Sequence, residues 1–138
     1  MHIPPWLLYS ALTVIAWGVV GLLQKLSTNH VSAESSLIWL GVGFAVIEPF
    51  LYPGVAVLHY SVWNLTWALL SGVFNALGAW ALFAALKSGG KASIVAPLTA
   101  LYPVIVILIV PLVLHESITR LQLGGVVCAL VAVVLLSA

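Results

Sequence analysis

Residues 93–114 read SIVAPLTALYPVIVILIVPLVL, a stretch of 22 residues without a charged side chain. A helix that spans the hydrocarbon core of a bilayer needs about 20 mostly apolar residues, so this stretch is long enough to cross a membrane. Val104–Val110 is apolar at every position and does not alternate with polar residues, as a strand of a membrane barrel would. The stretch therefore predicts a membrane-spanning helix.

The composition of the whole chain points the same way. Of its 138 residues, 64% are hydrophobic and 5% are charged, and the mean hydropathy is +1.26. Soluble domains carry about a quarter charged residues, because a small fold needs a polar surface. Four Lys or Arg and three Glu cannot cover such a surface, and they do not supply the clustered positive charge that binds nucleic acid. What remains is an integral membrane protein whose first partner is the lipid bilayer.

Apolar stretches of this kind recur along the chain and predict an all-α bundle of about five transmembrane helices. They cover residues 6–23, 37–58, 65–86, 93–114 and 121–137. With their short connections they form a single transmembrane domain over residues 1–138. Thr119 and Gln122 have the spacing of a capping box that opens the last helix, and Gly89 supplies a helix-ending turn.

Polar or small residues follow one face of each of the first three predicted helices. The candidate solute-binding residues among them are Ser10, Thr13, Trp17, Glu48, Tyr52 and Asn75. Lipid does not favour such stripes, whereas contacts between helices or a water-filled cavity do. Two interpretations stay open, namely tight helix packing and a cavity that binds a solute.

Glu48 lies near the middle of the second predicted span, and no other carboxylate lies so deep. A charge there is costly, and acids inside membranes serve ion or proton pathways. We expect Glu48 to exchange a proton. The alternatives are a neutral, hydrogen-bonded structural role and a shifted helix that brings Glu48 close to an interface. Pro49 follows directly and indicates a local distortion.

Prolines also interrupt the fourth predicted helix. Pro103 removes a backbone hydrogen bond and frees a carbonyl near the middle of the span. In lipid such a carbonyl must face protein or water, and transporters bind solutes where helices break at the midplane. Tyr102 is therefore a further candidate for solute binding. The alternative is a static kink that only shapes packing.

The last predicted helix carries small residues in place of polar ones. Gly124, Cys128 and Ala132 recur every four residues, a spacing that lets another helix approach closely. We expect them to form a packing surface or a dimer contact. Metal sites and cofactors are not expected, because His115 has no second His at helical spacing and no phosphate-binding glycine loop is present. The chain is not expected to be an enzyme.

Short motifs follow one another in the second half of the chain, with Trp17-Gly18 in the first helix. In chain order they are Ala85-Leu86, Ala96-Pro97-Leu98, Tyr102-Pro103, Glu116, Thr119, Gln122 and Gly125. This succession resembles the EamA domain of the drug/metabolite transporter superfamily. His115 stands where that family usually has Gly before the Glu.

The resemblance implies a secondary transporter, of the exporting kind, for a small metabolite in a bacterial-type inner or plasma membrane. Most such proteins contain two five-helix units arranged as inverted repeats. It therefore implies that this chain works as a homodimer, which an antiparallel arrangement would suit, or as a heterodimer with a paralogue. Lys25, Lys87 and Lys91 lie opposite the side of the N-terminus, which Arg120 shares, so the positive-inside rule favours a cytoplasmic C-terminus.

Two other functions remain open at this point. One is a membrane subunit that transports nothing and binds a partner in a heteromeric complex. The other is a proton antiporter of the small multidrug type. Proteins of that type place an essential Glu in the first helix, and residues 6–23 contain none.

Overall fold

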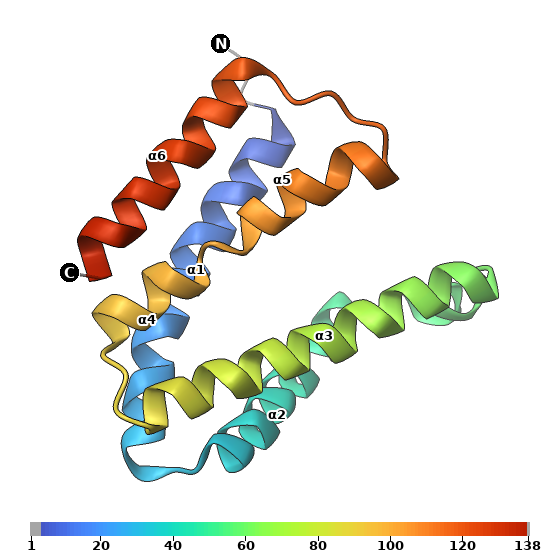
Figure 1. Cartoon of the computed structure of the whole chain (residues 1–138). Helices are drawn as coiled ribbons and strands as arrows, with labels where there is room; N and C mark the ends of the chain where they lie inside the picture. Colours follow the sequence, from blue (N-terminus) through green and yellow to red (C-terminus); the bar gives the residue numbers. More distant parts are fainter. Residues whose placement is uncertain (1–3, 138) are drawn as a thin grey trace. The chain divides into compact units, whose positions relative to one another are not determined.

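The computed structural model describes residues 4–137, so residues 1–3 and 138 of the predicted domain lie outside it (Figure 1). The described residues form helices and no strand, which confirms the all-α class. In chain order the elements are α1 (Pro5–His30), α2 (Ala33–Leu51), η1 (Gly54–Leu58), α3 (Val62–Lys87), α4 (Ala92–Thr99), α5 (Tyr102–Val113) and α6 (Arg120–Ser137). The chain divides between Gly89 and Gly90 into two compact units, which hold α1 to α3 and α4 to α6.

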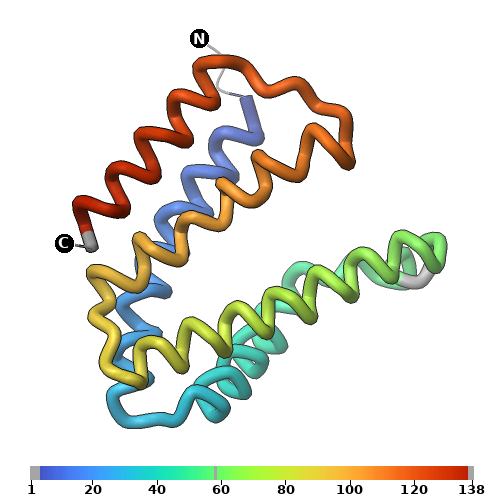
Figure 2. The backbone as a smooth tube through the Cα atoms, in the orientation of Figure 1, coloured from blue at the N-terminus to red at the C-terminus, as the bar shows by residue number. Residues whose placement is uncertain are grey.

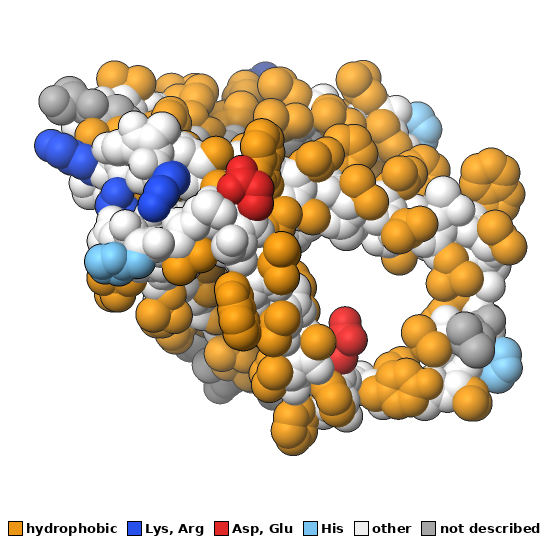
Figure 3. Space-filling model, turned by 90° about the horizontal axis from the view of Figure 1, so that it is seen from below, with side chains coloured by type: hydrophobic (Ala, Val, Ile, Leu, Met, Phe, Trp, Pro, Cys, Tyr) orange, Lys and Arg blue, Asp and Glu red, His pale blue; other side chains and the backbone are white. Residues whose placement is uncertain are grey.

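Within residues 4–137, four stretches are long and apolar enough to cross a membrane. They are α1, α2, α3 and the 22 residues Ala92–Val113, which α4 and α5 share. Within α6 the apolar helix Arg120–Leu136 is shorter, so a fifth crossing stays a prediction. Hydrophobic side chains cover most of the surface seen in Figure 3, as lipid contact requires and water would not favour. The chain is a multi-pass membrane protein.

The helices of the first unit converge at one end. α2 and α3 run side by side, and α1 contacts both (Figure 2). The buried side chains of this unit are Thr28, Ala33, Ser36, Phe83 and Leu86, a group that we call the apex. They lie near the C-terminal ends of α1 and α3 and at the N-terminal end of α2. Away from the apex, most side chains of the three helices are exposed.

α1 is longer than the apolar run predicted at 6–23. It begins at Pro5, whose restricted φ suits the first helical position, and it continues to His30. Its last turns are polar, and they stay helical because their side chains form hydrogen bonds at the apex. Lys25 Nζ donates a hydrogen bond to the Leu86 carbonyl at 3.1 Å. The hydroxyls of Ser27 and Ser36 lie 3.1 Å apart.

α2 is shifted toward the N-terminus relative to the predicted span 37–58. Ser32 caps the helix, because its Oγ accepts a hydrogen bond from the Ser35 backbone N–H at 3.2 Å. Helical geometry therefore starts at Ala33, before the apolar run begins.

The C-terminal end of α2 differs from the predicted span 37–58, which placed Tyr52 inside the helix. Pro53 disfavours helical geometry in the residue before it. Tyr52 accordingly has an extended backbone, with φ −65° and ψ 119°, and α2 ends at Leu51. Residues 54–58 form η1 in place of the last turns of the predicted helix. Tyr52 thus does not continue the helical stripe that contains Glu48.

In the second unit the predicted helix 93–114 is broken into α4 and α5. α4 ends at Thr99 and α5 begins at Tyr102. Pro103 explains the break, because it has no N–H for the Thr99 carbonyl and its ring would clash with that carbonyl in a continuous helix. α6 packs back against α4, where Val95 and Val133 are buried.

α6 opens with the capping box that its sequence predicts. The Gln122 backbone N–H donates to Thr119 Oγ1 at 3.2 Å. In return, the Thr119 backbone N–H donates to Gln122 Oε1 at 2.8 Å. Two N–H groups that lack an intrahelical partner are satisfied in this way.

Candidate solute site

The predicted site residues of the first unit lie outside the apex. Ser10, Thr13, Trp17, Glu48, Tyr52 and Asn75 are all exposed, and so is Tyr102 in the second unit. None of them lines either of the two grooves found in the second unit. A solute cavity built from these side chains therefore stays a prediction.

The hydroxyl groups of the first stripe form hydrogen bonds within α1. Ser10 Oγ donates to the Trp6 carbonyl at 2.8 Å, and Thr13 Oγ1 donates to the Tyr9 carbonyl at 2.9 Å. A hydroxyl that bonds back one turn is satisfied without a partner helix, so it can lie in a membrane. Each oxygen keeps lone pairs that can accept a hydrogen bond from a solute.

Glu48 lies in the last turn of α2, because the helix ends at Leu51. Three residues correspond to about 4.5 Å along a helix axis, so Glu48 is closer to the end of its helix than the predicted span indicates. Pro49, inside the helix, has no N–H for the Ala45 carbonyl. No group of three His, Cys or carboxylate side chains suited to a metal ion occurs among residues 4–137, so Glu48 has no such companions there.

The polar groups that the structure does bring together lie at the apex, and sequence reasoning did not single them out. Lys25 donates a hydrogen bond to the Leu86 carbonyl, and Trp80 Nε1 donates one to Glu34 Oε1 at 3.4 Å. Thr28 Oγ1 donates to the Gln24 carbonyl at 2.9 Å. The Thr28 bond lies within α1, whereas the bonds of Lys25 and Trp80 join α3 to α1 and to α2 at one end. The available signal was the polar sequence around residues 24–36, which reads as a loop when only apolar length is considered.

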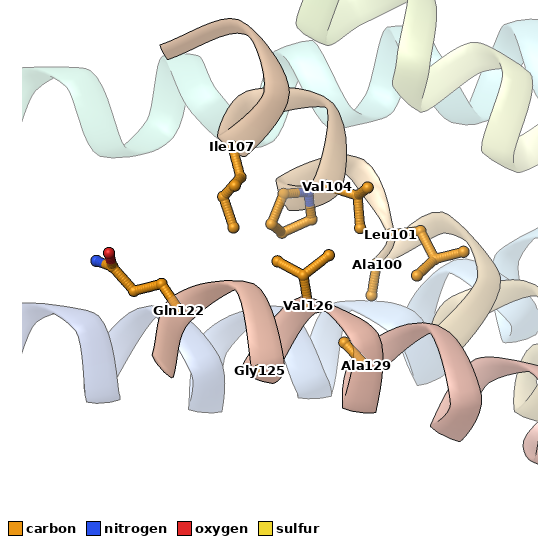
Figure 4. A pocket seen from close by; sticks show the side chains of 9 residues that line it. Ala100, Leu101, Val104, Ile107, Gln122, Gly125, Val126 and Ala129 are labelled. Carbon is orange, nitrogen blue, oxygen red and sulfur yellow. The ribbon is translucent and has the colours of Figure 1, made fainter. Parts of the chain in front are cut away.

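An apolar groove of about 220 Å³ runs between the α4–α5 segment and α6 (Figure 4). Its lining includes Val104 and Ile107 on one side and Gly125, Val126 and Ala129 on the other. Gln122 is the polar side chain of the lining, and its Oε1 is engaged by Thr119. The groove suits an apolar group better than a polar solute.

A second groove, of about 200 Å³, lies beside Glu116 and Ser117. It shares Ile107 and Gln122 with the first groove. Of its three polar lining residues, Glu116 and Ser117 come from the loop between α5 and α6, and Gln122 comes from the first turn of α6. This groove therefore lies at the end of the helices rather than at their middle.

The small-residue stripe of α6 lies on a different face from the one that packs in its own unit. Val126 and Val133 are covered, and their spacing places them on one helix face. Gly124, Cys128 and Ala132 are exposed, and a Cβ added at Gly124 would meet nothing within 4 Å. Contact between this stripe and a second subunit stays a prediction.

Comparisons with known proteins follow the resemblance seen in the motifs. The EamA-like transporter family matches residues 4–138. The chain is also similar to the uncharacterized protein MJ1333.1 of Methanocaldococcus jannaschii. The two are 33% identical over 98 residues, which cover 71% of this chain and 69% of that protein. No solved structure gives a significant match.

Proposed function

Because the chain belongs to the EamA-like transporter family, we propose that it exports a small metabolite as a secondary transporter and works as a dimer. The family match over residues 4–138 is the observation that carries this proposal. The four long apolar stretches give the chain the crossing helices that such a transporter needs.

The exposed polar side chains support a solute path along α1 and α3. Trp17 and Asn75 carry hydrogen-bonding groups on helices that are otherwise apolar, and both are exposed. Polar groups inside a membrane face protein, water or a solute rather than lipid. We propose that the solute contacts these two side chains and the hydroxyls of Ser10 and Thr13, with Tyr52 and Tyr102 as further contacts.

The proposed dimer rests on the resemblance to proteins that pair two five-helix units in opposite orientations. The family match covers one such unit, at residues 4–138. A second copy inserted the other way, or a paralogue, would restore the pair. We propose that the solute path lies between the polar faces of the two subunits.

Transport into or out of proteoliposomes tests the proposal. The purified chain is reconstituted with labelled polar metabolites, such as amino acids, inside the vesicles, and release is followed with and without an imposed pH gradient. We expect release faster than from empty liposomes. A chain that forms dimers but moves no solute in a broad panel would instead be a non-transporting subunit.

Glu48 is the proposed proton-coupling residue, and Glu48→Gln removes its charge with little change in shape. We expect this variant to lose the pH-driven part of transport while the protein stays folded. Glu116→Gln is the matched control, because it makes the same chemical change in the loop before α6. If Glu48→Gln transports with the normal pH dependence, Glu48 is structural.

A further inference from the structure

Two polar side chains of the proposed solute path lie at the middle of their helices. α1 and α3 contain 26 residues each, and Trp17 and Asn75 lie next to the centres of these helices. A helix that crosses a bilayer has its centre near the midplane, which is the depth at which transporters bind their solutes. The charges available at this depth therefore decide which solutes the path can accept.

The helices of the chain carry few charges away from their ends. Residues 5–24 of α1 and 62–86 of α3 contain no Lys, Arg, His or carboxylate, and neither do residues 92–113 and 121–137. The cationic residues all lie at or near helix ends, namely Lys25, Lys87, Lys91 and Arg120. A second copy of the chain has the same distribution, so a dimer adds no cation near the midplane.

α2 holds two carboxylates, and both are distant from the midplane position of Asn75. α2 and α3 run side by side in opposite directions, and the hydrogen bond of Trp80 to Glu34 sets their register (Figure 2). Glu48 lies fourteen residues beyond Glu34, about 21 Å, whereas Asn75 lies five residues before Trp80, about 7.5 Å. Glu48 and Asn75 thus differ by about 13 Å in depth, so one small solute does not contact both. Glu34 is engaged by Trp80 at the apex.

The hydroxyls of α1 offer a solute acceptors rather than donors. Ser10 and Thr13 donate their protons to the carbonyls of Trp6 and Tyr9. The lone pairs that remain on each oxygen accept hydrogen bonds from an O–H or N–H group. The amide of Asn75 can both donate and accept. The path therefore suits a solute that donates several hydrogen bonds.

An ion is a poor occupant of such a path. A charge near the bilayer centre is costly, and it is found there with a counter-charge or with water. The depth of Trp17 and Asn75 provides hydroxyl, indole and amide groups instead of counter-charges. On the basis of the solute path proposed above, we infer that the transported solute is an uncharged polyhydroxy compound. Its hydroxyls satisfy the acceptors of α1 and the amide of α3 without a counter-ion.

Release of three labelled pentitol compounds from proteoliposomes tests the class of solute. Xylitol is uncharged, xylonate carries a carboxylate, and 1-amino-1-deoxyxylitol carries an ammonium group on nearly the same skeleton. The rates are measured without a pH gradient and are corrected for release from empty liposomes. We expect xylitol to leave fastest and both ions to leave roughly 50-fold more slowly, because the central part of the path lacks a counter-charge.

Variants of α3 change the expected preference. Asn75→Asp places a carboxylate at the centre of the helix and should raise the release of aminodeoxyxylitol relative to xylitol by about tenfold. Asn64→Asp is the matched control, because it makes the same change in the first turn of α3. Asn64 lies eleven residues from Asn75, about 16 Å along the axis, so this variant should keep the preference for xylitol.

A second pair of variants tests the path if Asn75→Asp does not fold. Thr13→Val removes an acceptor oxygen at nearly constant volume and should slow the release of xylitol by about fivefold. Thr66→Val is its control, because Thr66 Oγ1 donates to the Val62 carbonyl in the same way near the start of α3. Its release rate should equal that of the unchanged chain.

The outcomes separate the class of solute from transport itself. Faster release of either ion than of xylitol by the unchanged chain would overturn the inference and leave the transporter function intact. A chain that releases amino acids but not xylitol would overturn it as well. So would unchanged rates in both Asn75→Asp and Thr13→Val, because the solute would then not contact these groups. A chain that releases no solute of any class would instead refute the proposed transport function, and the inference would fall with it.

Discussion

At the scale of single residues, Lys25 shows how a charged side chain is accommodated at the end of a membrane helix. Its Nζ donates to the Leu86 carbonyl, one residue before the end of α3. The last carbonyls of a helix have no intrahelical partner, and they lie at the negative end of the helix dipole. The ammonium group therefore satisfies a backbone acceptor and joins α1 to α3 at the apex.

Lys25→Met should remove this hydrogen bond between α1 and α3 while keeping a side chain of similar length. A hydrogen bond to a charged group contributes about 1.5–3 kcal/mol, so we expect a loss of stability of that order. Thermal unfolding in detergent measures it. Lys87→Met serves as the control, because Lys87 is exposed. Equal unfolding temperatures for Lys25→Met and the unchanged chain would show that the bond does not hold the apex.

His115 occupies the position where the family usually has glycine, and its backbone explains that preference. Its φ is 56°, in the left-handed region that side chains disfavour. It follows Leu114, where α5 is capped, so the left-handed residue ends the helix. The departure from the family pattern therefore stores strain of about 1–2 kcal/mol.

Substitutions at this position should separate strain from side-chain contacts. His115→Gly relieves the strain but adds freedom to the unfolded chain, so we expect a gain of less than about 1 kcal/mol. His115→Val places a β-branched residue in the same conformation and should lower stability by more than 1 kcal/mol, roughly. Thermal unfolding of the two variants side by side measures the difference. A valine variant as stable as the glycine variant would contradict the assigned backbone conformation.

At the scale of elements, apolar length predicts that the helices exist but not where they end. Apolar length places the end of α1 at residue 23, because Gln24 and Lys25 are polar. The helix nevertheless continues to His30, because its polar side chains form hydrogen bonds with other elements. Apolar length also predicts that α2 extends past Leu51, because residues 54–58 are apolar. Pro53 instead disfavours helical geometry at Tyr52, and the helix ends before it. Two helix ends were predicted from local chemistry. They are the N-terminus of α6, through Thr119 and Gln122, and the C-terminus of α3, which is followed by Gly89 with φ 108°.

The candidate site is less predictable than the helices for a physical reason. Helical spacing places Ser10 and Thr13 on one face, but it does not reveal whether their hydroxyls bond to α1 itself or to a neighbour. The depth of Glu48 depended on the end of its helix, which Pro53 sets from outside the stripe. The apex was missed because its bonds join residues far apart in sequence, such as Glu34 and Trp80.

The exposed stripe of α6 gives a prediction about assembly rather than folding. Within this chain, a Cβ at Gly124 meets nothing within 4 Å, so Gly124→Leu should leave the stability of the monomer nearly unchanged. If the stripe contacts a second subunit, the larger side chain holds the helices apart and the dimer dissociates. The oligomer size in detergent, measured by light scattering, tests this. Leu130→Ile, a volume-conserving change on α6, is the control. A Gly124→Leu variant that remains dimeric would exclude the stripe from the interface.

At the scale of the whole molecule, the number of lysines and the dimer are linked. The five predicted spans place Lys25, Lys87 and Lys91 on one side of the membrane and Arg120 on the other, a difference of two positive charges. So small a difference orients a chain weakly, and both orientations of the unit are what an antiparallel homodimer needs.

Reporter fusions after Ala138 test the antiparallel homodimer directly. We expect signal both from a reporter active only in the cytoplasm and from one active only outside, because a weak charge bias lets the unit insert both ways. Tyr60→Lys adds a positive charge to the exposed turn before α3 and should increase the exterior signal at the expense of the cytoplasmic one. Trp63→Phe, a neutral change near the same turn, should leave the ratio unchanged. Signal from the cytoplasmic reporter alone would remove the self-antiparallel dimer. An oppositely oriented paralogue would then have to supply the second unit, and a parallel dimer would refute the inverted-repeat arrangement altogether.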